Sequence, residues 1–261
     1  MEVQPALEVR LLGGFQVIVA GQSVPEHAWR RKRAAAVVKL LALAPAHRLH
    51  RDEIIESLWP DLDPDAAANN LRVALHHARR ILTAGDSAEA ILPRVGDIIL
   101  LAPGYAIRSD VAHFETAVRQ AWQSPEPAFT RAALDLYAGD LLPDDRYEDW
   151  VEGRRTALRT SFLALLRRLA QLHEQRGEFD AAIAALQQAV ASEPVDEDAH
   201  VALIRLFARA GETHRALNQF DRLTAILASE LAAEPQAATT DLIAAIREGR
   251  FQSEVAAPIW H

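Results

Sequence analysis

The sequence predicts a mainly α-helical chain with a small β component, arranged as two domains in succession. Short β-rich stretches and amphipathic helical patterns alternate before residue 110, whereas helical patterns alone follow it. In the second part, two glycines stand 34 residues apart in similar surroundings, which indicates a helical repeat. At 261 residues, the chain is long enough for two hydrophobic cores.

Composition places the chain among ordinary globular proteins, because 50% of its residues are hydrophobic and 25% are charged. The longest apolar runs are shorter than the roughly 20 residues that a membrane helix needs, and residues 1–2 do not start a basic signal peptide. We therefore expect a cytoplasmic protein without a membrane partner. The absence of cysteine excludes a disulfide framework, a thiolate metal site and a thiol nucleophile.

The net charge of −8 belongs to the second part of the chain. Residues 1–110 hold 13 basic and 13 acidic residues, whereas residues 111–261 hold 15 basic and 23 acidic residues. In the first part the basic residues cluster, at positions 30–33 and again at positions 72–80. Such clusters can form a local positive surface suited to nucleic acid, which the overall charge conceals.

The first part begins with strand signals, and helical patterns follow them. Residues 7–19 are rich in β-forming residues and are broken by Gly13 and Gly14, which predicts short antiparallel strands. Turns that contain proline then separate three helical patterns. These patterns cover Trp29–Leu43, Arg51–Leu58 and Asp63–Leu82.

A hairpin signal closes the first part. Gly96 and Asp97 form a two-residue turn signal between the β-rich residues 91–95 and 98–101, and residues 105–107 follow as another short strand. Strands, three helices and a hairpin are the order of a winged helix-turn-helix domain. We place this domain, as the DNA-binding domain, at residues 1–107.

The third helical pattern has an outer face that is unusually polar and cationic. Asp63 can cap its amino end and Pro64 suits the first helical position, so the start of the helix is well specified. Helical periodicity separates an apolar stripe from an outer face that holds almost no carboxylates. The stripe comprises Ala67, Leu71, Ala74, Leu75, Ala78 and Leu82, and the outer face comprises Asn69, Val73, His76, His77 and Arg80, flanked by Arg72 and Arg79.

This outer face has the residue types that read the major groove of DNA. Asparagine can pair with adenine, valine can contact the thymine methyl group, and arginine can bind guanine or phosphate. A merely solvated helix face is the alternative interpretation. We predict that bases are read by Asn69, Val73 and His76, and that phosphates are held by Arg31, Arg72, Arg79, Arg80 and, near the tip of the hairpin, Arg94.

The second part contains a repeat with the period of tetratricopeptide helix pairs. Gly177 and Gly211 align at a spacing of 34 residues. The flanking positions also match, since Leu172 aligns with Leu206, Ala182 with Ala216 and Leu186 with Phe220. We predict an all-α repeat domain at residues 111–250 and a C-terminal tail at 251–261. Repeat domains of this kind bind partners, so this domain is expected to serve recognition or self-assembly.

Several segments, in order across both parts, carry a family resemblance. In the first part they are LLGGFQV near Leu11, the basic residues 31–33, DEIIESLWPD and NNLRVALHHARRIL; in the second part they are DVAHFE, LYAGDLLPD, EDWVEGRRTAL, the two glycine repeats and ELAAEP. The chain thereby resembles bacterial regulators of the antibiotic-regulatory-protein type, which join an OmpR-like winged helix to a bacterial transcriptional activation domain. One departure is His50, which stands where relatives often have a serine or threonine cap and so predicts a weaker cap.

The resemblance implies sequence-specific binding to promoter DNA, often at direct repeats, and recruitment of RNA polymerase. It also allows a homodimer on DNA. In OmpR-like regulators, the turn before the recognition helix commonly contacts RNA polymerase, and here that turn carries Asp61 and Leu62. Two prolines stiffen this turn, although a simple helix connector is an equally good interpretation.

We therefore predict a DNA-binding transcriptional regulator that activates by recruiting RNA polymerase. The rival interpretation is a repeat-based adaptor whose winged helix does not bind DNA. An enzyme is not expected, because no paired carboxylates, Ser-His-Asp set or phosphate-binding loop stands in a supporting context. His47, His50 and Glu53 have metal-like spacing but lack a fourth ligand, so no metal or other cofactor is predicted.

Overall fold

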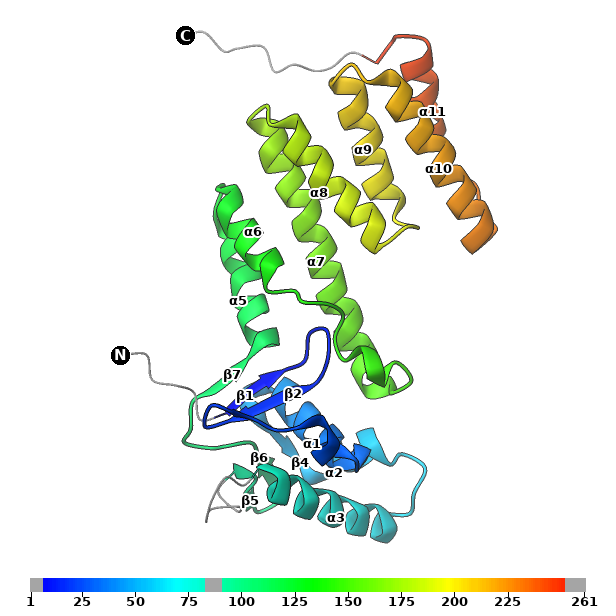
Figure 1. Cartoon of the computed structure of the whole chain (residues 1–261). Coiled ribbons are helices and arrows are strands. Elements are labelled where there is room, and N and C mark those ends of the chain that lie inside the picture. Colours follow the sequence, from blue (N-terminus) through cyan, green and yellow to red (C-terminus); the bar gives the residue numbers. More distant parts are fainter. Residues whose placement is uncertain (1–6, 83–90, 252–261) are drawn as a thin grey trace. The chain divides into compact units, whose positions relative to one another are not determined.

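The computed structural model describes residues 7–82 and 91–251 (Figure 1). The chain divides into two compact units. Unit 1 comprises Met1–Thr116 and Asp135–Arg159, and unit 2 comprises Ala117–Leu134 and Thr160–His261. Helices α5 (Asp110–Gln123) and α7 (Asp149–Gln175) contribute residues to both units.

Unit 1 contains a four-stranded sheet in the order β3-β2-β1-β7. The predicted antiparallel pair is confirmed, with Val9 opposite Val17. The last strand instead joins β1 in parallel, with Leu7 opposite Ile107, so it closes the sheet across about one hundred residues of intervening sequence. The strands are β1 (Leu7–Arg10), β2 (Gln16–Val19), β3 (Gln22–Ser23) and β7 (Ile107–Ser109).

Three helices form the core of unit 1, beside a second sheet. The first predicted helix begins at Lys32, because residues 26–29 form a separate 3-10 turn. The buried Val37, Leu41, Ile54 and Leu58 lie at its centre. The helices are α1 (Lys32–Leu43), α2 (Arg51–Leu58) and α3 (Pro64–Leu82); further 3-10 turns lie at Pro45–His47 and Pro143–Asp145.

The predicted hairpin is present as the outer part of the second sheet, whose order is β4-β6-β5. Val95 pairs with Ile98 across the two-residue turn, and Gly96 adopts a φ of +62° there, which suits glycine. Ile99 is fully buried and fixes the hairpin to the helices. The strands are β4 (Arg48–His50), β5 (Arg94–Val95) and β6 (Ile98–Leu100).

His50 caps α2 well, so the expectation of a weak cap is wrong. Its Nδ1 accepts a hydrogen bond from the backbone N–H of Asp52 at 3.2 Å. Glu53 Oε2 in turn accepts from the backbone N–H of His50 at 2.7 Å, which completes a capping box. An imidazole nitrogen therefore takes the place of the hydroxyl that this motif usually contains.

Residues 135–159 belong to unit 1 through backbone contacts with its first strands. The N–H of Leu142 donates to the carbonyl of Leu11, and the N–H of Gly13 donates to the carbonyl of Asp140, both at 2.9 Å. Gly13 has a φ of +77°, and a Cβ there would lie 3.0 Å from the carbonyl oxygen of Ala138. The two segments thus approach each other more closely than a side chain at Gly13 would permit.

A charged pair and a capping carboxylate hold the same region. The ammonium of Lys39, on α1, lies 2.5 Å from the carboxylate of Asp145. Asp110 Oδ2 accepts from the N–H groups of Leu11 and Leu12, both at 2.8 Å, at the start of α5. Burial nevertheless raises the pKa of Asp110, because desolvation outweighs these donors.

Unit 2 is a helical repeat, which confirms the predicted fold class. Gly177 and Gly211 both lie in turns between paired helices, with φ of +75° and +78°. Ala182 and Ala216 are both fully buried at the start of the second helix of each pair, where their small size permits close packing. Besides α7, the helices are α6 (Pro127–Asp135), α8 (Phe179–Ser192), α9 (Glu197–Arg209), α10 (Thr213–Leu231) and α11 (Ala237–Arg247). None of the helices in the described part of the chain is long and apolar enough to cross a membrane.

Candidate nucleic-acid interface

Helix α3 is seated by the apolar stripe that its periodicity predicts. The buried residues of α3 are the six residues of that stripe, Ala67, Leu71, Ala74, Leu75, Ala78 and Leu82. At its start, Asp63 Oδ1 accepts hydrogen bonds from the N–H groups of Asp65 and Ala66, at 3.1 and 3.0 Å. The cap and the stripe together fix which residues of α3 face outward.

The three residues predicted to face bases lie together on the exposed face of α3. Asn69, Val73 and His76 are all exposed, and their spacing of four and three residues places them in one row. Val73 is 40% exposed, which is high for a large aliphatic side chain on a helix with a well-defined core face. Arg72 and Arg80 flank this row and are also exposed.

Arg72 is already oriented by a neighbour on the same face. Its Nη2 donates to the side-chain oxygen of Asn69 at 2.6 Å. This contact orders both side chains. The amide oxygen of Asn69 has a second lone pair, so it can accept a further donor while it stays bound to Arg72.

Two of the predicted phosphate-binding arginines also hold the hairpin in place. The guanidinium of Arg79 donates through Nε and Nη2 to the carbonyl oxygen of Leu92, at 2.9 and 2.7 Å. Arg94 donates to the carbonyl of Gly96 at 2.6 Å and to Asp97 Oδ1 at 2.7 Å. Both guanidinium groups therefore have a structural role in addition to the predicted contact with phosphate.

A cleft of about 440 Å³ lies between α3 and the hairpin, and arginines line it. Three of them, Arg72, Arg79 and Arg94, were predicted from the sequence to bind phosphates. Arg51, at the start of α2, is a fourth lining residue that was not predicted. The backbone N–H of Arg51 donates to the carbonyl of Asp97 at 2.8 Å, so the hairpin turn meets the start of α2. This contact is non-local, which is why no local pattern reveals it.

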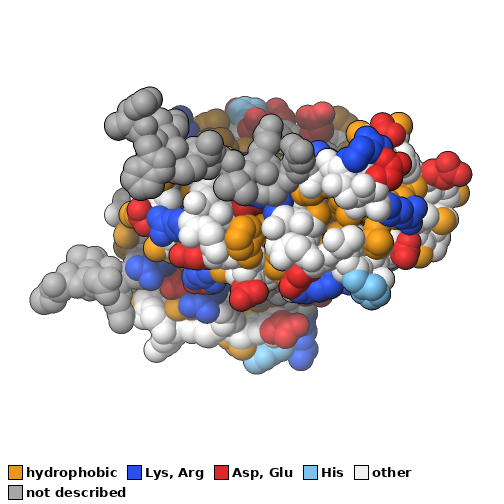
Figure 2. All heavy atoms as spheres, turned by 90° about the horizontal axis from the view of Figure 1, so that it is seen from above, with side chains coloured by type: hydrophobic (Ala, Val, Ile, Leu, Met, Phe, Trp, Pro, Cys, Tyr) orange, Lys and Arg blue, Asp and Glu red, His pale blue; other side chains and the backbone are white. Residues whose placement is uncertain are grey.

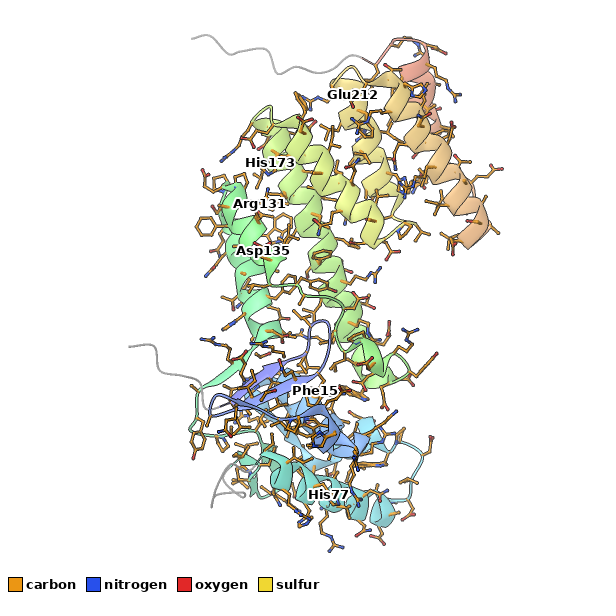
Figure 3. All side chains as sticks on the ribbon, viewed as in Figure 1. Phe15, His77, Arg131, Asp135, His173 and Glu212 are labelled. Carbon is orange, nitrogen blue, oxygen red and sulfur yellow. The ribbon has the colours of Figure 1, made fainter. Side chains whose placement is uncertain are left out.

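The histidines of α3 differ in their surroundings. His77 (Figure 3) is half-buried, and its desolvation together with the nearby charges of Arg31 and Arg80 lowers its pKa. His77 is therefore neutral near pH 7 and can both donate and accept a hydrogen bond. The effect of Arg31 also places that residue, which precedes α1, close to the basic face of α3.

The turn that was predicted to contact RNA polymerase is exposed. Asp61 is exposed and Leu62 is 44% exposed. The N–H of Leu62 donates to the carbonyl of Trp59 at 3.3 Å, which ties the turn to the end of α2.

In the described ranges, 7–82 and 91–251, no group of three or more acidic or histidine side chains is arranged so as to hold a metal ion.

The chain joins a winged-helix domain, whose helix α3 has a polar and cationic outer face, to a helical repeat. This combination defines a class of protein. The family described as bacterial transcriptional activator domain matches residues 109–247, more than half of the chain. The chain therefore belongs to this family. The resemblance to regulators of the antibiotic-regulatory-protein type is thereby confirmed.

The fold is similar to a solved structure described as Mycobacterium tuberculosis EmbR in complex with low affinity phosphopeptide. The TM-score is 0.75 at 22% sequence identity. The match covers 94% of this chain and 66% of that chain, so this chain spans slightly less than two thirds of the solved structure. At this identity the likeness shows the fold alone. A comparison with curated protein sequences gave no match.

Proposed function

We propose that the chain regulates transcription by binding promoter DNA through α3 and the β5–β6 hairpin. The observation that carries this proposal is the exposed row of Asn69, Val73 and His76, on a capped helix flanked by arginines. In this proposal, residues 1–107 supply the DNA contacts and residues 111–250 supply the contacts that activate transcription.

Each side chain of the interface then has a role that fits its present contacts. Asn69, Val73 and His76 read base edges in the major groove. Arg31, Arg72 and Arg80 bind phosphates, and so do Arg79 and Arg94, which also hold the hairpin. Asp61 and Leu62 offer a short acidic turn to RNA polymerase. We also propose that the chain binds direct repeats in the promoter as a homodimer. In this proposal it acts in the cytoplasm and catalyses no reaction.

Selection of bound sequences from a random duplex pool tests the proposal. The full chain should enrich one sequence motif, and Asn69→Ala should relax the preference at one base position, at a cost of about 1–3 kcal/mol of discrimination. Arg108→Ala is the matched control, because Arg108 is exposed on β7 in the other sheet. It should leave the motif unchanged.

Enrichment of no motif by the wild-type chain would favour the rival adaptor function for unit 1. Equal relaxation by Asn69→Ala and Arg108→Ala would show that α3 is not the reading element.

A further inference from the structure

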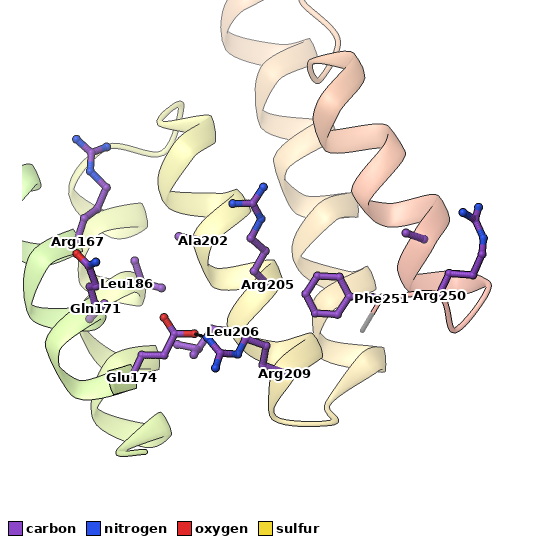
Figure 4. Close-up of a pocket in the computed structure, with 12 residues that line it drawn as sticks. Arg167, Gln171, Glu174, Leu186, Ala202, Arg205, Leu206, Arg209, Arg250 and Phe251 are labelled. Carbon is purple, nitrogen blue, oxygen red and sulfur yellow. Dashed lines mark hydrogen bonds and ion pairs between the residues drawn. The ribbon is translucent and has the colours of Figure 1, made fainter. Parts of the chain in front are cut away.

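Unit 2 contains a second arginine-lined site, which is separate from α3. It is an open groove of about 730 Å³ formed by α7, α8, α9 and the end of α11 (Figure 4). Small and apolar side chains, among them Ala202, Leu206 and Phe251, form its floor and rim. Four arginines and a single glutamate, Glu174, also line it.

The groove is a regular product of the repeat. On α7, residues 167, 170, 171 and 174 line it, and on α9, residues 202, 205, 206 and 209 do so. Both sets have the spacing i, i+3, i+4, i+7, so each is one face of its helix. The first helices of successive repeats thus present matching faces to one groove, which is how helical repeats form extended binding surfaces.

The rim at the end of α11 is fixed by backbone hydrogen bonds. Gly249 has a φ of +66°, and the N–H groups of Arg250 and Phe251 both donate to the carbonyl of Ala245, at 2.9 and 3.1 Å. This closing turn is a common way to end a helix. It places the ring of Phe251 on the side of α9, whereas the guanidinium of Arg250 lies on the far side of α11 (Figure 4).

The arginines of the groove differ in how far their charge is already compensated. Arg209 pairs with Glu174 at 2.5 Å, Arg167 pairs with Asp196 at 2.7 Å, and Arg250 pairs with Glu248. Arg205 is exposed, and within the described part of the chain it has no hydrogen-bond or ion-pair partner. In Figure 4 its guanidinium extends away from α9 above the ring of Phe251.

This concentration of arginine is local. Residues 111–261 carry 23 acidic and 15 basic residues, and acidic and basic side chains are interspersed on the face that Figure 2 shows. Within such a domain, the uncompensated charge of Arg205 in the groove offers local complementarity to one anionic group.

We propose that this groove binds an acidic peptide segment of a partner protein. A carboxylate of the peptide binds the guanidinium of Arg205, in the bidentate geometry that arginine and carboxylates favour. An adjacent apolar side chain of the peptide packs on Ala202 and Phe251. The peptide lies extended along the groove from α7 to the end of α11. The groove is distinct from α3, so this site goes beyond the proposed DNA binding and can fail or hold independently of it.

A carboxylate peptide fits these observations better than duplex DNA. A duplex presents many phosphates along its length, and the net negative charge of residues 111–261 would oppose them. The groove instead provides one uncompensated guanidinium next to an apolar floor. That pairing suits one carboxylate beside one apolar side chain.

Fluorescence anisotropy with the full chain tests the site. The probe is a short fluorescein-labelled peptide of aspartate, glutamate and leucine, and the reference peptide has asparagine and glutamine in place of the acids. The acidic peptide should bind at least about tenfold more tightly than the reference, since a charge-assisted hydrogen bond contributes more than a neutral one. Arg205→Gln should weaken the acidic peptide by about tenfold and leave the reference peptide unchanged.

A second variant and a matched control keep the test decisive. Ala202→Glu places a carboxylate one turn before Arg205, where it can form an i,i+3 ion pair, and should weaken the acidic peptide in the same way. Arg222→Gln removes an exposed arginine of α10 outside the groove and should leave the affinity within about twofold of wild type. Thermal unfolding by circular dichroism confirms that each variant is folded.

Three results would overturn the proposal. They are equal affinity for the acidic and reference peptides, including binding of neither; unchanged affinity in Arg205→Gln; and displacement of the peptide by duplex DNA in a manner that depends on Arg205. The last result would identify the groove as a nucleic-acid surface.

Discussion

The two arginine-lined sites of this chain differ in the groups that hold their arginines. In the hairpin beside α3, Arg94 pairs with Asp97, but on α3 itself Arg79 donates to a backbone carbonyl and Arg72 donates to the neutral amide of Asn69. In the groove of unit 2, Arg167 and Arg209 instead pair with carboxylates. A neutral acceptor orients a guanidinium without cancelling its charge, whereas a carboxylate cancels most of it. The exposed face of α3 therefore keeps the charges of Arg72 and Arg80, whereas the groove keeps the one local charge of Arg205.

This difference matches two kinds of ligand. A helix face on which several arginines keep their charge suits a polyanion, and binding there should depend steeply on salt. A single guanidinium in an apolar groove suits one carboxylate, and the contact should depend on geometry more than on ionic strength.

The largest loss in the free energy of unfolding should come from removing residues 135–159 from unit 1. Leu141 and Leu142 are fully buried, and Leu142 donates a backbone hydrogen bond to Leu11. A fragment that ends at residue 110 should unfold with a free energy at least about 3 kcal/mol below that of a fragment ending at 159, since two buried leucines contribute about 1.5–3 kcal/mol each. Urea denaturation of both fragments measures this, and equal stability would show that residues 1–110 fold independently.

Arg79→Ala should be the most destabilising change among the arginines of α3. It removes two hydrogen bonds from the carbonyl of Leu92, a residue that is fully buried. The expected loss is about 2 kcal/mol in the free energy of unfolding, because a buried carbonyl is left without its donors. Arg80→Ala, on the exposed face, should cost less than about 0.5 kcal/mol. Equal losses would contradict the structural role of Arg79.

Sequence periodicity predicted the helices of this interface well but missed the groups that orient its arginines. The six buried residues of α3 and the bounds of α2 follow from apolar spacing and local turn residues, which the sequence carries directly. The parallel pairing of β7 with β1 and the contact of Arg51 with the hairpin turn join segments far apart in the chain. The same is true of residues 135–159 in unit 1. Local patterns do not encode such non-local contacts.

The sequence did not predict the groove of unit 2, for a related reason. Its two lining faces are visible on α7 and α9 only once the helices are in register, and Arg250 and Phe251 join them through the turn that follows α11. The 34-residue repeat was the available signal. Comparing the two helix faces would have shown that both contribute arginine, although the arginines stand at non-equivalent positions.

The stability of unit 2 should fall in mild acid because of His200. This histidine is fully buried; its Nδ1 lies 2.8 Å from Gln219 Nε2 and its Nε2 lies 3.1 Å from the carbonyl of Pro194. Burial lowers its pKa from the usual 6.5, so below that pH the unfolded chain takes up a proton that the folded chain does not. Stability therefore decreases as the pH falls below 6.5, by up to about 1.4 kcal/mol per pH unit.

His200→Gln isolates this contribution. The variant should be less stable than wild type at about pH 7.5. The difference in free energy of unfolding should narrow by about pH 5.5, because only the wild type has a histidine that takes up a proton on unfolding. Denaturation at the two pH values measures the gap. A gap that stays constant would show that folding leaves the pKa of His200 unchanged.

The smallest effect on stability should come from Asp61→Arg in the exposed turn before α3. Asp61 lies outside the cap that Asp63 forms, so the change should alter the free energy of unfolding by less than about 0.5 kcal/mol and leave DNA affinity intact. If this turn contacts RNA polymerase, promoter activation in a reconstituted transcription assay should be lost. Normal activation would make the turn a simple connector.

The salt dependence of duplex binding by the full chain tests whether α3 binds DNA. We predict that the logarithm of the association constant falls linearly with the logarithm of the salt concentration. Arg80→Gln should reduce the slope by about one for every sequence tested. Arg108→Gln, in the other sheet, should leave the slope unchanged. An affinity that is independent of salt, or a slope that both variants change equally, would contradict DNA binding through α3.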